Sequence, residues 1–277
     1  MKPNALLFGT AGIPLCSKGP TEKGIAEVKR LGLGAMELEF VHSINISKEK
    51  APLVRKASED NGIVLTCHAP YYINLNSNDT EKFNASKDRI LKSAHILNLC
   101  GGWSLCFHPG FYQVSTKEDA YSKVSSAIKE MAKSLEKEKN GVWLRPETTG
   151  KETQFGSLSE ILKISSECEN VMPCIDFAHL HARSNGKYNS KKEFASILED
   201  VERTLGKRGL QNMHIHLTGI EYGEKGEKKH LNLEESDLKF EELLSVLKDF
   251  NAKGVVISES PNVEKDAILA QKIYAGL

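Results

Sequence analysis

The sequence predicts a closed (β/α)8 barrel, the TIM barrel, formed as a single domain by residues 1–277. Eight short apolar segments alternate with eight amphipathic segments, at about 35 residues per unit. This alternation requires parallel strands with right-handed crossovers, and eight units in 277 residues match a closed barrel. An open doubly wound sheet is the alternative, but no glycine-rich dinucleotide turn follows the first predicted strand, and no linker divides the chain.

In the first half of the chain, apolar runs predict four strands and the segments between them predict four helices. The strands are expected at residues 5–9, 35–41, 63–67 and 104–107. The helices are expected at residues 21–31, 47–60, 80–99 and 115–139. Thr21 is a candidate N-cap for the first helix, and Gly62 follows the second helix as a candidate C-cap.

The second half repeats the pattern with four more strands and four more helices. The strands are expected at residues 142–146, 171–175, 212–217 and 254–258. The helices are expected at residues 158–167, 191–205, 237–250 and 263–274. We expect loops directly after the sixth strand and, in a highly charged segment, after the seventh.

Composition narrows the class of protein. Lysine plus arginine and aspartate plus glutamate each number 37, so net charge does not indicate a binder of bulk polyanions. Six cysteines form no CxxC pair, which argues against a zinc ribbon and a secreted disulfide framework. No signal peptide is recognisable, and no stretch reaches the roughly 20 apolar residues that span a bilayer. We expect a cytoplasmic protein without a membrane or protein partner.

Most of the predicted strands end in a metal-binding type of side chain. Because the C-terminal ends of all barrel strands meet on one face, these side chains are expected to share one site. Imidazole nitrogen and carboxylate oxygen suit zinc, manganese or iron. The residues, from six consecutive strands, are His68, His108, Glu147, Asp176 with His179, His216 and Glu259.

These donors exceed the roughly four ligands of one tetrahedral zinc ion. A bridging carboxylate can hold two ions about 3.5 to 4 Å apart, a geometry that clamps a phosphoryl group and activates water. Glu147 stands in the middle of the run and is the natural bridge. The sequence therefore predicts a centre with more than one ion.

Together these motifs resemble those of endonuclease IV, the zinc-dependent apurinic/apyrimidinic endonucleases. The motifs are His68-Ala-Pro-Tyr-Tyr-Ile-Asn-Leu, His108-Pro-Gly, Glu147-Thr-Thr-Gly, Ile-Asp176-x-x-His179, His216-Leu and Glu259-Ser-Pro. The resemblance runs over about residues 5–270. It implies a hydrolase that cuts the phosphodiester 5′ to an abasic site in double-stranded DNA, during base excision repair, through in-line attack by a metal-bridged hydroxide.

The resemblance also implies ligand sets for two or three zinc ions, with manganese as a possible substitute. One ion would be held by His68, His108 and Glu147. A second would be held by Glu147, Asp176, His216 and Glu259, and a third by His179. Glu147 and Glu259 are the expected catalytic residues, and Tyr71 matches the tyrosine that the family presses against DNA.

Two departures from the family pattern concern the third ion and DNA recognition. The family completes the ligand set of the third ion with an Asp-x-His pair. Here Lys228 precedes His230 by two residues, and it cannot ligate while charged. His230 remains a candidate ligand, and Glu227 is a substitute if the backbone is shifted. The loop after the second strand, residues 40–45, lacks the arginine expected for insertion into a duplex.

Two other functions remain open. A sugar isomerase or epimerase of a similar barrel would hold one manganese ion with Glu147, Asp176, His216 and Glu259, and its two glutamates would shuttle protons. That reaction does not need the further imidazoles of residues 68, 108 and 179. A non-catalytic DNA-binding relative is less consistent with a complete ligand set. Of the remaining histidines, His214 is expected inside the barrel and His181 in solvent.

Overall fold

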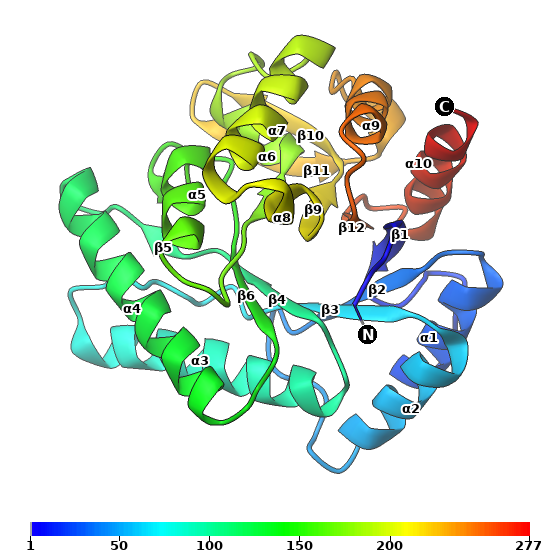
Figure 1. Cartoon of the computed structure of the whole chain (residues 1–277), viewed down its shortest axis with the longest axis horizontal. Helices are drawn as coiled ribbons and strands as arrows, with labels where there is room; N and C mark the ends of the chain where they lie inside the picture. The colour runs from blue at the N-terminus through cyan, green and yellow to red at the C-terminus, as the bar shows by residue number, and fades with distance from the viewer. Residues whose placement is uncertain (1) are drawn as a thin grey trace.

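The structure is a computed structural model, described here for residues 2–277, in which a parallel sheet of eight strands curls into a barrel (Figure 1). The order around the sheet is β6-β4-β3-β2-β1-β12-β9-β8. Isolated bridges from Leu144 to Val171 and from Glu147 to Cys174 connect its two edges. The (β/α)8 prediction is therefore confirmed. The barrel strands are β1 (Leu6–Ala11), β2 (Ala35–Glu39), β3 (Val64–His68), β4 (Ser104–Phe107), β6 (Trp143–Pro146), β8 (Cys174–Asp176), β9 (Met213–Leu217) and β12 (Gly254–Ser258).

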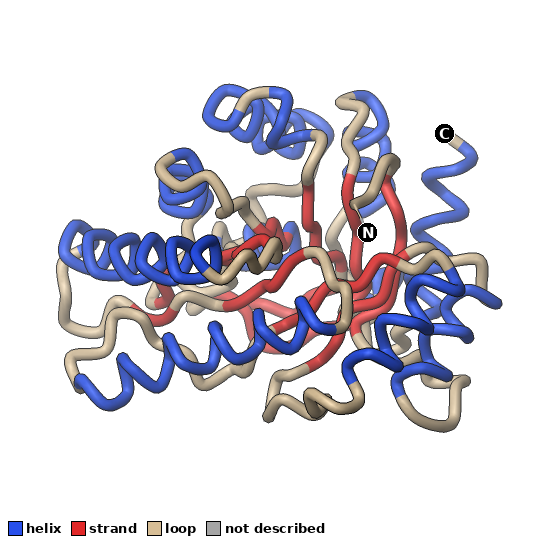
Figure 2. The backbone as a smooth tube through the Cα atoms, turned by 60° about the horizontal axis from the view of Figure 1, so that its bottom comes forward, coloured by secondary structure: helices blue, strands red, loops and turns tan. Residues whose placement is uncertain are grey.

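All eight predicted helices are present, and they pack around the outside of the strands (Figures 1 and 2). They are α1 (Thr21–Arg30), α2 (Ala51–Asn61), α3 (Thr80–Leu99), α4 (Lys117–Lys137), α5 (Leu158–Ser166), α7 (Lys191–Leu205), α9 (Phe240–Asp249) and α10 (Glu264–Gly276). Gly62 ends α2 in the left-handed conformation, as predicted. Thr21 is not an N-cap: it is the first residue of α1, and Pro20 takes the cap position. None of the helices within residues 2–277 is long and apolar enough to cross a membrane, and the cytoplasmic location stays a prediction.

Several short elements were not predicted. The charged segment after β9 is not a loop but a hairpin of β10 (Gly219–Gly223) and β11 (Gly226–Leu231). The segment after β8 is also not a loop, because it forms α6 (Phe177–Arg183), too short to show helical periodicity. The other additions are β5 (Gly110–Phe111), which pairs with β7 (Gln154–Phe155), α8 (Lys207–Leu210) and a 3-10 turn at Leu233–Glu235.

An arginine fills the N-terminal end of the barrel interior. The Arg145 guanidinium donates to the carbonyls of Pro173 and Asn212 at 3.1 and 2.9 Å, and to Asn212 Oδ1 at 2.7 Å. It also stacks over the Trp103 ring, 4.6 Å from the ring centroid. Burial lowers the pKa of Arg145 to about 9. Pro173 and Asn212 directly precede β8 and β9, so this side chain connects the N-terminal ends of these two strands to β6.

We expect Arg145→Met to lower the free energy of unfolding by roughly 2–4 kcal/mol, because it leaves buried carbonyl oxygens without a hydrogen-bond donor. Urea denaturation of the metal-free protein measures the change. Arg203→Met is the matched control, since the Arg203 side chain is 75% exposed, and it should change stability by less than about 0.5 kcal/mol. Equal stabilities of the two variants would contradict the structural role of Arg145.

Candidate metal centre

The C-terminal face of the barrel gathers all seven strand-end donors that were singled out in the sequence. Three of them lie within barrel strands: His68 in β3, Asp176 in β8 and His216 in β9. Three follow barrel strands: His108 after β4, Glu147 after β6 and Glu259 after β12. The seventh, His179, lies in α6. Together with Glu227 and His230, their donor atoms form three groups whose members lie within 4.8 Å of one another. The groups are His68, His108 and Glu147; Glu147, Asp176, His216 and Glu259; and His179, Glu227 and His230.

Glu147 joins the first two groups. Its Oε2 lies 3.3 Å from His68 Nε2 and 3.1 Å from His108 Nε2. Its Oε1 lies 3.1 Å from His216 Nδ1 and 3.3 Å from His179 Nδ1. Burial alone would raise the pKa of this fully buried carboxyl, but the charges of His108 and His216 outweigh burial and hold the pKa well below its usual range. Each oxygen thus faces a different pair of imidazoles, which is the arrangement of a bridging ligand.

Among residues 2–277, one carboxylate oxygen of Asp176 has no hydrogen-bond partner. Its Oδ1 accepts a hydrogen bond from the His179 backbone N–H at 2.6 Å and caps α6. Its Oδ2 is buried without a hydrogen bond, 3.5 Å from His179 Nδ1. Burial raises the pKa of Asp176 to about 8, and Glu259 and Glu147 add to the effect. A buried oxygen that lacks a hydrogen bond and lies among imidazoles fits a divalent metal ion, which would supply further positive charge.

Backbone carbonyls orient two of the imidazoles. His68 Nδ1 lies 2.7 Å from the Ala69 carbonyl, and His179 Nδ1 lies 3.0 Å from the Thr148 carbonyl. A carbonyl can only accept, so each Nδ1 carries a proton and each Nε2 is the nitrogen that an ion can bind. Metal-binding histidines are commonly oriented in this way by an acceptor on the far nitrogen.

A β-bulge brings Glu227 and His230 to the same face of β11. Glu221 pairs with Lys229 and Tyr222 with Glu227, so Lys228 is the extra residue of the bulge. Without the bulge, residues three apart on a strand would point to opposite faces. Glu227 Oε2 lies 3.5 Å from His179 Nε2, and Glu227 Oε1 lies 3.9 Å from His230 Nε2. The hairpin therefore offers Glu227 where the family pattern has an aspartate two residues before the histidine.

Two glycines allow the hairpin to approach this site. The Glu227 backbone N–H donates to the Gly150 carbonyl at 3.0 Å. A Cβ on Gly150 would lie 2.6 Å from Glu227 Cβ and 3.2 Å from His179 Cδ2. Gly226 has a φ of 86°, in the left-handed region, and a Cβ there would lie 2.2 Å from the Gly150 carbonyl oxygen. Close backbone contact thus fixes the distance between Glu227 and His179.

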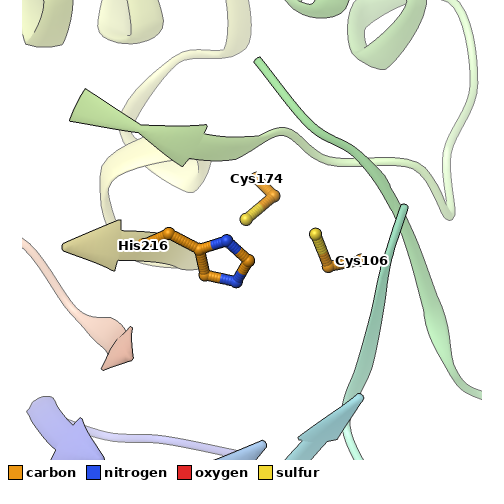
Figure 3. A group of neighbouring side chains, drawn as sticks. All are labelled: Cys106, Cys174 and His216. Carbon is orange, nitrogen blue, oxygen red and sulfur yellow. The ribbon is translucent and has the colours of Figure 1, made fainter. Parts of the chain in front are cut away.

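Two thiols lie beside His216 (Figure 3). The sulfurs of Cys106 and Cys174 lie within 4.8 Å of each other and of a His216 ring nitrogen. The Cys106 thiol donates to Glu147 Oε2 at 3.0 Å. Both cysteines are fully buried, as expected of small apolar strand residues. Cys106 therefore also has a polar role, because its S–H contacts the bridging carboxylate.

Sequence reasoning missed two acidic residues of β2, Glu37 and Glu39. Glu37 is fully buried and contacts His214 and His216. Burial raises the pKa of Glu39 to about 8, with a further contribution from the negative charge of Glu37. The available signal was their spacing: residues two apart on a barrel strand share a face, and an apolar neighbour on either side of each glutamate indicates that both point inward.

Other sequence predictions for this face had mixed outcomes. His214 is buried in the barrel interior, as predicted, and Ser104 Oγ lies 3.0 Å from its Nδ1. The prediction that His181 faces solvent was wrong, because this side chain is fully buried and contacts Asp237 Oδ1 at 3.0 Å. Tyr71 is 56% exposed at the rim, and its ring centroid lies 5.4 Å from that of His68.

We expect Gly150→Ala to weaken the third donor group selectively. The new methyl group displaces Glu227 from His179, which should lower the affinity for the ion at this group by about tenfold or more. Metal content after dialysis against a graded chelator series measures the loss. Gly141→Ala is the control, since a Cβ at Gly141 would meet no other atom of residues 2–277 within 4 Å beyond its chain neighbours. Unchanged metal content in the Gly150 variant would show that Glu227 holds no ion.

Metal affinity should depend on pH. In the metal-free protein, burial lowers the pKa of His68, but the hydrogen bond to Glu147 outweighs it and raises the pKa to about 10. His68 and Asp176 therefore both hold a proton at neutral pH, and a bound ion must displace it. We expect zinc affinity to increase by roughly tenfold or more per unit between pH 6 and pH 8. Competition with a chromophoric chelator measures it, and a flat profile would contradict ligation by these groups.

Similar sequences support the resemblance noted above. An uncharacterised protein of Methanocaldococcus jannaschii is 48% identical over 269 residues, which cover 97% of each chain. A probable endonuclease 4 of Mesomycoplasma hyopneumoniae is 29% identical over 210 residues, which cover 74% of this chain and 72% of that protein. The predicted relationship to endonuclease IV is therefore confirmed.

Solved structures with similar folds include both a nuclease and an epimerase-like protein. Endonuclease IV from Thermus thermophilus aligns with a TM-score of 0.74 at 18% identity, covering 97% of this chain and 98% of that one. A D-tagatose 3-epimerase-like protein aligns with a TM-score of 0.75 at 17% identity, covering 98% and 96%. Identities this low show the fold alone. A family model for the xylose isomerase-like TIM barrel matches residues 25–274, and the chain belongs to that family.

Proposed function

We propose that this protein is a zinc-dependent endonuclease that cleaves the phosphodiester 5′ to abasic sites in double-stranded DNA, as part of base excision repair. In this proposal residues 1–277 form one domain, with the metal centre at the C-terminal strand ends. The observation that carries the proposal is the position of Glu147, whose two oxygens face separate imidazole pairs at 3.1–3.3 Å. A carboxylate with imidazoles on both sides supports a centre with at least two ions.

The three donor groups would hold two or three zinc ions, or manganese in their place. One ion would bind His68, His108 and Glu147, and the third would bind His179, Glu227 and His230. The second ion would bind the four residues of the remaining group: Glu147, Asp176, His216 and Glu259. When bound, the ions would lower the pKa of a water molecule and neutralise charge that develops on the phosphodiester.

An aromatic and basic cavity beside the centre supports a nucleic-acid substrate. Its volume is about 860 Å³, and Tyr71 links it to the centre because the Tyr71 ring also packs edge-on against His68. Exposed aromatic rings can stack on bases, and cationic side chains can contact phosphates. The lining includes Tyr71, Tyr72, Phe111, Lys82 and Arg89. Lys82 pairs with Asp79, which also lines the cavity, so Arg89 is the main source of positive charge there, although the loop after β2 has no arginine.

The related sequences agree with this choice. The curated relative from Mesomycoplasma hyopneumoniae is named a probable endonuclease 4, and the alignment covers most of both chains. The chemistry inferred from the site and the name of this relative point to the same reaction class.

A sugar epimerase is the second candidate, and one observation favours it. The group of Glu147, Asp176, His216 and Glu259 is complete by itself and matches the four-ligand set expected for one manganese ion. Its two glutamates could move protons beside a carbonyl. However, this reaction does not require the other two donor groups, which directly contact this group of four.

We expect the zinc-loaded protein to nick a duplex with a single abasic site without added magnesium, and chelation to stop the reaction. His68→Ala removes a ligand from the first group and should reduce nicking at least about 100-fold. His95→Ala is the control, because His95 lies on α3 and pairs with Glu138, which belongs to none of the donor groups. Gel analysis of a labelled duplex measures both variants.

The epimerase candidate makes the opposite prediction. One manganese or zinc ion per chain, conversion of a ketose and no nicking would overturn the nuclease proposal. His68→Ala would then have much less effect on turnover, because this residue lies outside the four-ligand set.

A further inference from the structure

A buried carboxylate lies beneath the metal centre and contacts two histidines of the same strand. Glu37 Oε1 lies 2.9 Å from His216 Nε2, and Glu37 Oε2 lies 3.0 Å from His214 Nε2. The Thr66 hydroxyl donates to Glu37 Oε2 at 2.6 Å. All four side chains are fully buried. This network was not anticipated from the sequence.

The contacts cross the barrel interior. Glu37 is on β2 and the histidines are on β9, and β1 and β12 separate these strands in the sheet. The two N···O contacts are short but bent. Among residues 2–277, no well-aligned hydrogen bond reaches Glu37 Oε1 or the Nε2 atom of either histidine. The carboxylate is therefore the acceptor within reach of both imidazoles.

We propose that Glu37 is a positioning residue that holds His216 in the Nε2–H tautomer, so that His216 Nδ1 presents its lone pair to the metal centre. This inference rests on the proposed metal centre. His216 Nδ1 lies 3.1 Å from Glu147 Oε1 and 3.4 Å from Glu259 Oε2, on the side where the second ion would bind. A neutral imidazole has one N–H, and an ionised carboxylate at Nε2 can only accept it. Acceptors of this kind orient metal-binding histidines and strengthen their basicity.

His214 completes the network without binding metal. In the matching tautomer of His214, the Ser104 hydroxyl would donate to His214 Nδ1, and the His214 Nε2–H would face Glu37 Oε2 at 3.0 Å in the bent geometry described above. Each N–H and O–H of the network would then face an acceptor within 3.0 Å, and the network would carry the single negative charge of Glu37. Alternatively, Glu37, His214 and His216 could themselves hold an ion, since their donor atoms converge within 4.8 Å. His216 would then have to bind ions through both ring nitrogens, as an imidazolate, if the second site above it is also filled.

The first test compares zinc affinities of Glu37 variants by competition with a chromophoric chelator. Glu37→Met keeps the volume of the side chain but removes the acceptor, and should weaken the second ion about 10- to 100-fold. Glu37→Gln keeps one amide oxygen for His216. The Thr66 hydroxyl can accept from the new NH2, and His214 can carry its proton on Nδ1, donate to Ser104 Oγ and accept from the NH2 at Nε2. Glu37→Gln should therefore lose less affinity than Glu37→Met. Thr66→Val, which leaves both imidazole contacts intact, is the matched control and should stay within about threefold of wild type.

The second test reads the tautomer directly. Two-bond 1H–15N spectra of the zinc-loaded, 15N-histidine-labelled protein should show His216 protonated at Nε2, and this signal should shift or broaden in Glu37→Met. Far-UV circular dichroism and thermal melting of the metal-free variants establish that each one folds. His214→Gln should leave the number of bound ions unchanged.

Three results would overturn the inference: a His216 proton at Nδ1, a Glu37→Met affinity equal to wild type, or the loss of one ion in His214→Gln. The last result would show that Glu37, His214 and His216 form a metal site of their own. None of these measurements uses DNA. A protein that passes them but nicks no abasic duplex would refute the proposed nuclease activity and leave the role of Glu37 standing.

Discussion

The contact of the Glu147 carboxylate with four imidazoles is the interaction on which the rest of the centre depends. A fully buried negative charge is costly unless positive groups or hydrogen-bond donors surround it. Here four histidines and the Cys106 thiol approach its two oxygens within 3.0–3.3 Å. The four histidines come from different segments of the barrel, and the barrel must close for them to meet. Closure includes a bridge made by Glu147 itself, whose backbone pairs with Cys174.

The fold and seven donors could be predicted because both follow from local pattern. Alternating apolar and amphipathic segments imply parallel strands, and parallel barrel strands bring their C-terminal ends together. A histidine or glutamate directly after an apolar run can then be placed on that face from the sequence alone. His68 and Asp176 end their strands in the structure, as expected.

The remaining features depend on contacts that sequence patterns do not record. The use of Glu227 depends on a bulge at Lys228 and on two glycines that let the hairpin approach. His181 is buried against the Tyr222 ring, with ring centroids 4.9 Å apart, and contacts Asp237, 56 residues away. The alternation of β2 points Glu37 inward, but its contacts with His214 and His216 arise only because β2 and β9 face each other across the interior. Each case is a tertiary contact of a polar residue with a partner that the local sequence does not specify.

Anomalous X-ray diffraction at the zinc absorption edge, from crystals of the zinc-loaded protein, tests the bridging role of Glu147 most directly. We expect two peaks that flank the Glu147 carboxylate, one beside His68 and His108 and one beside Asp176 and His216. A further peak between His179 and His230 is expected if the hairpin group is filled. A single peak confined to Glu147, Asp176, His216 and Glu259 would contradict the account and favour one-ion epimerase chemistry.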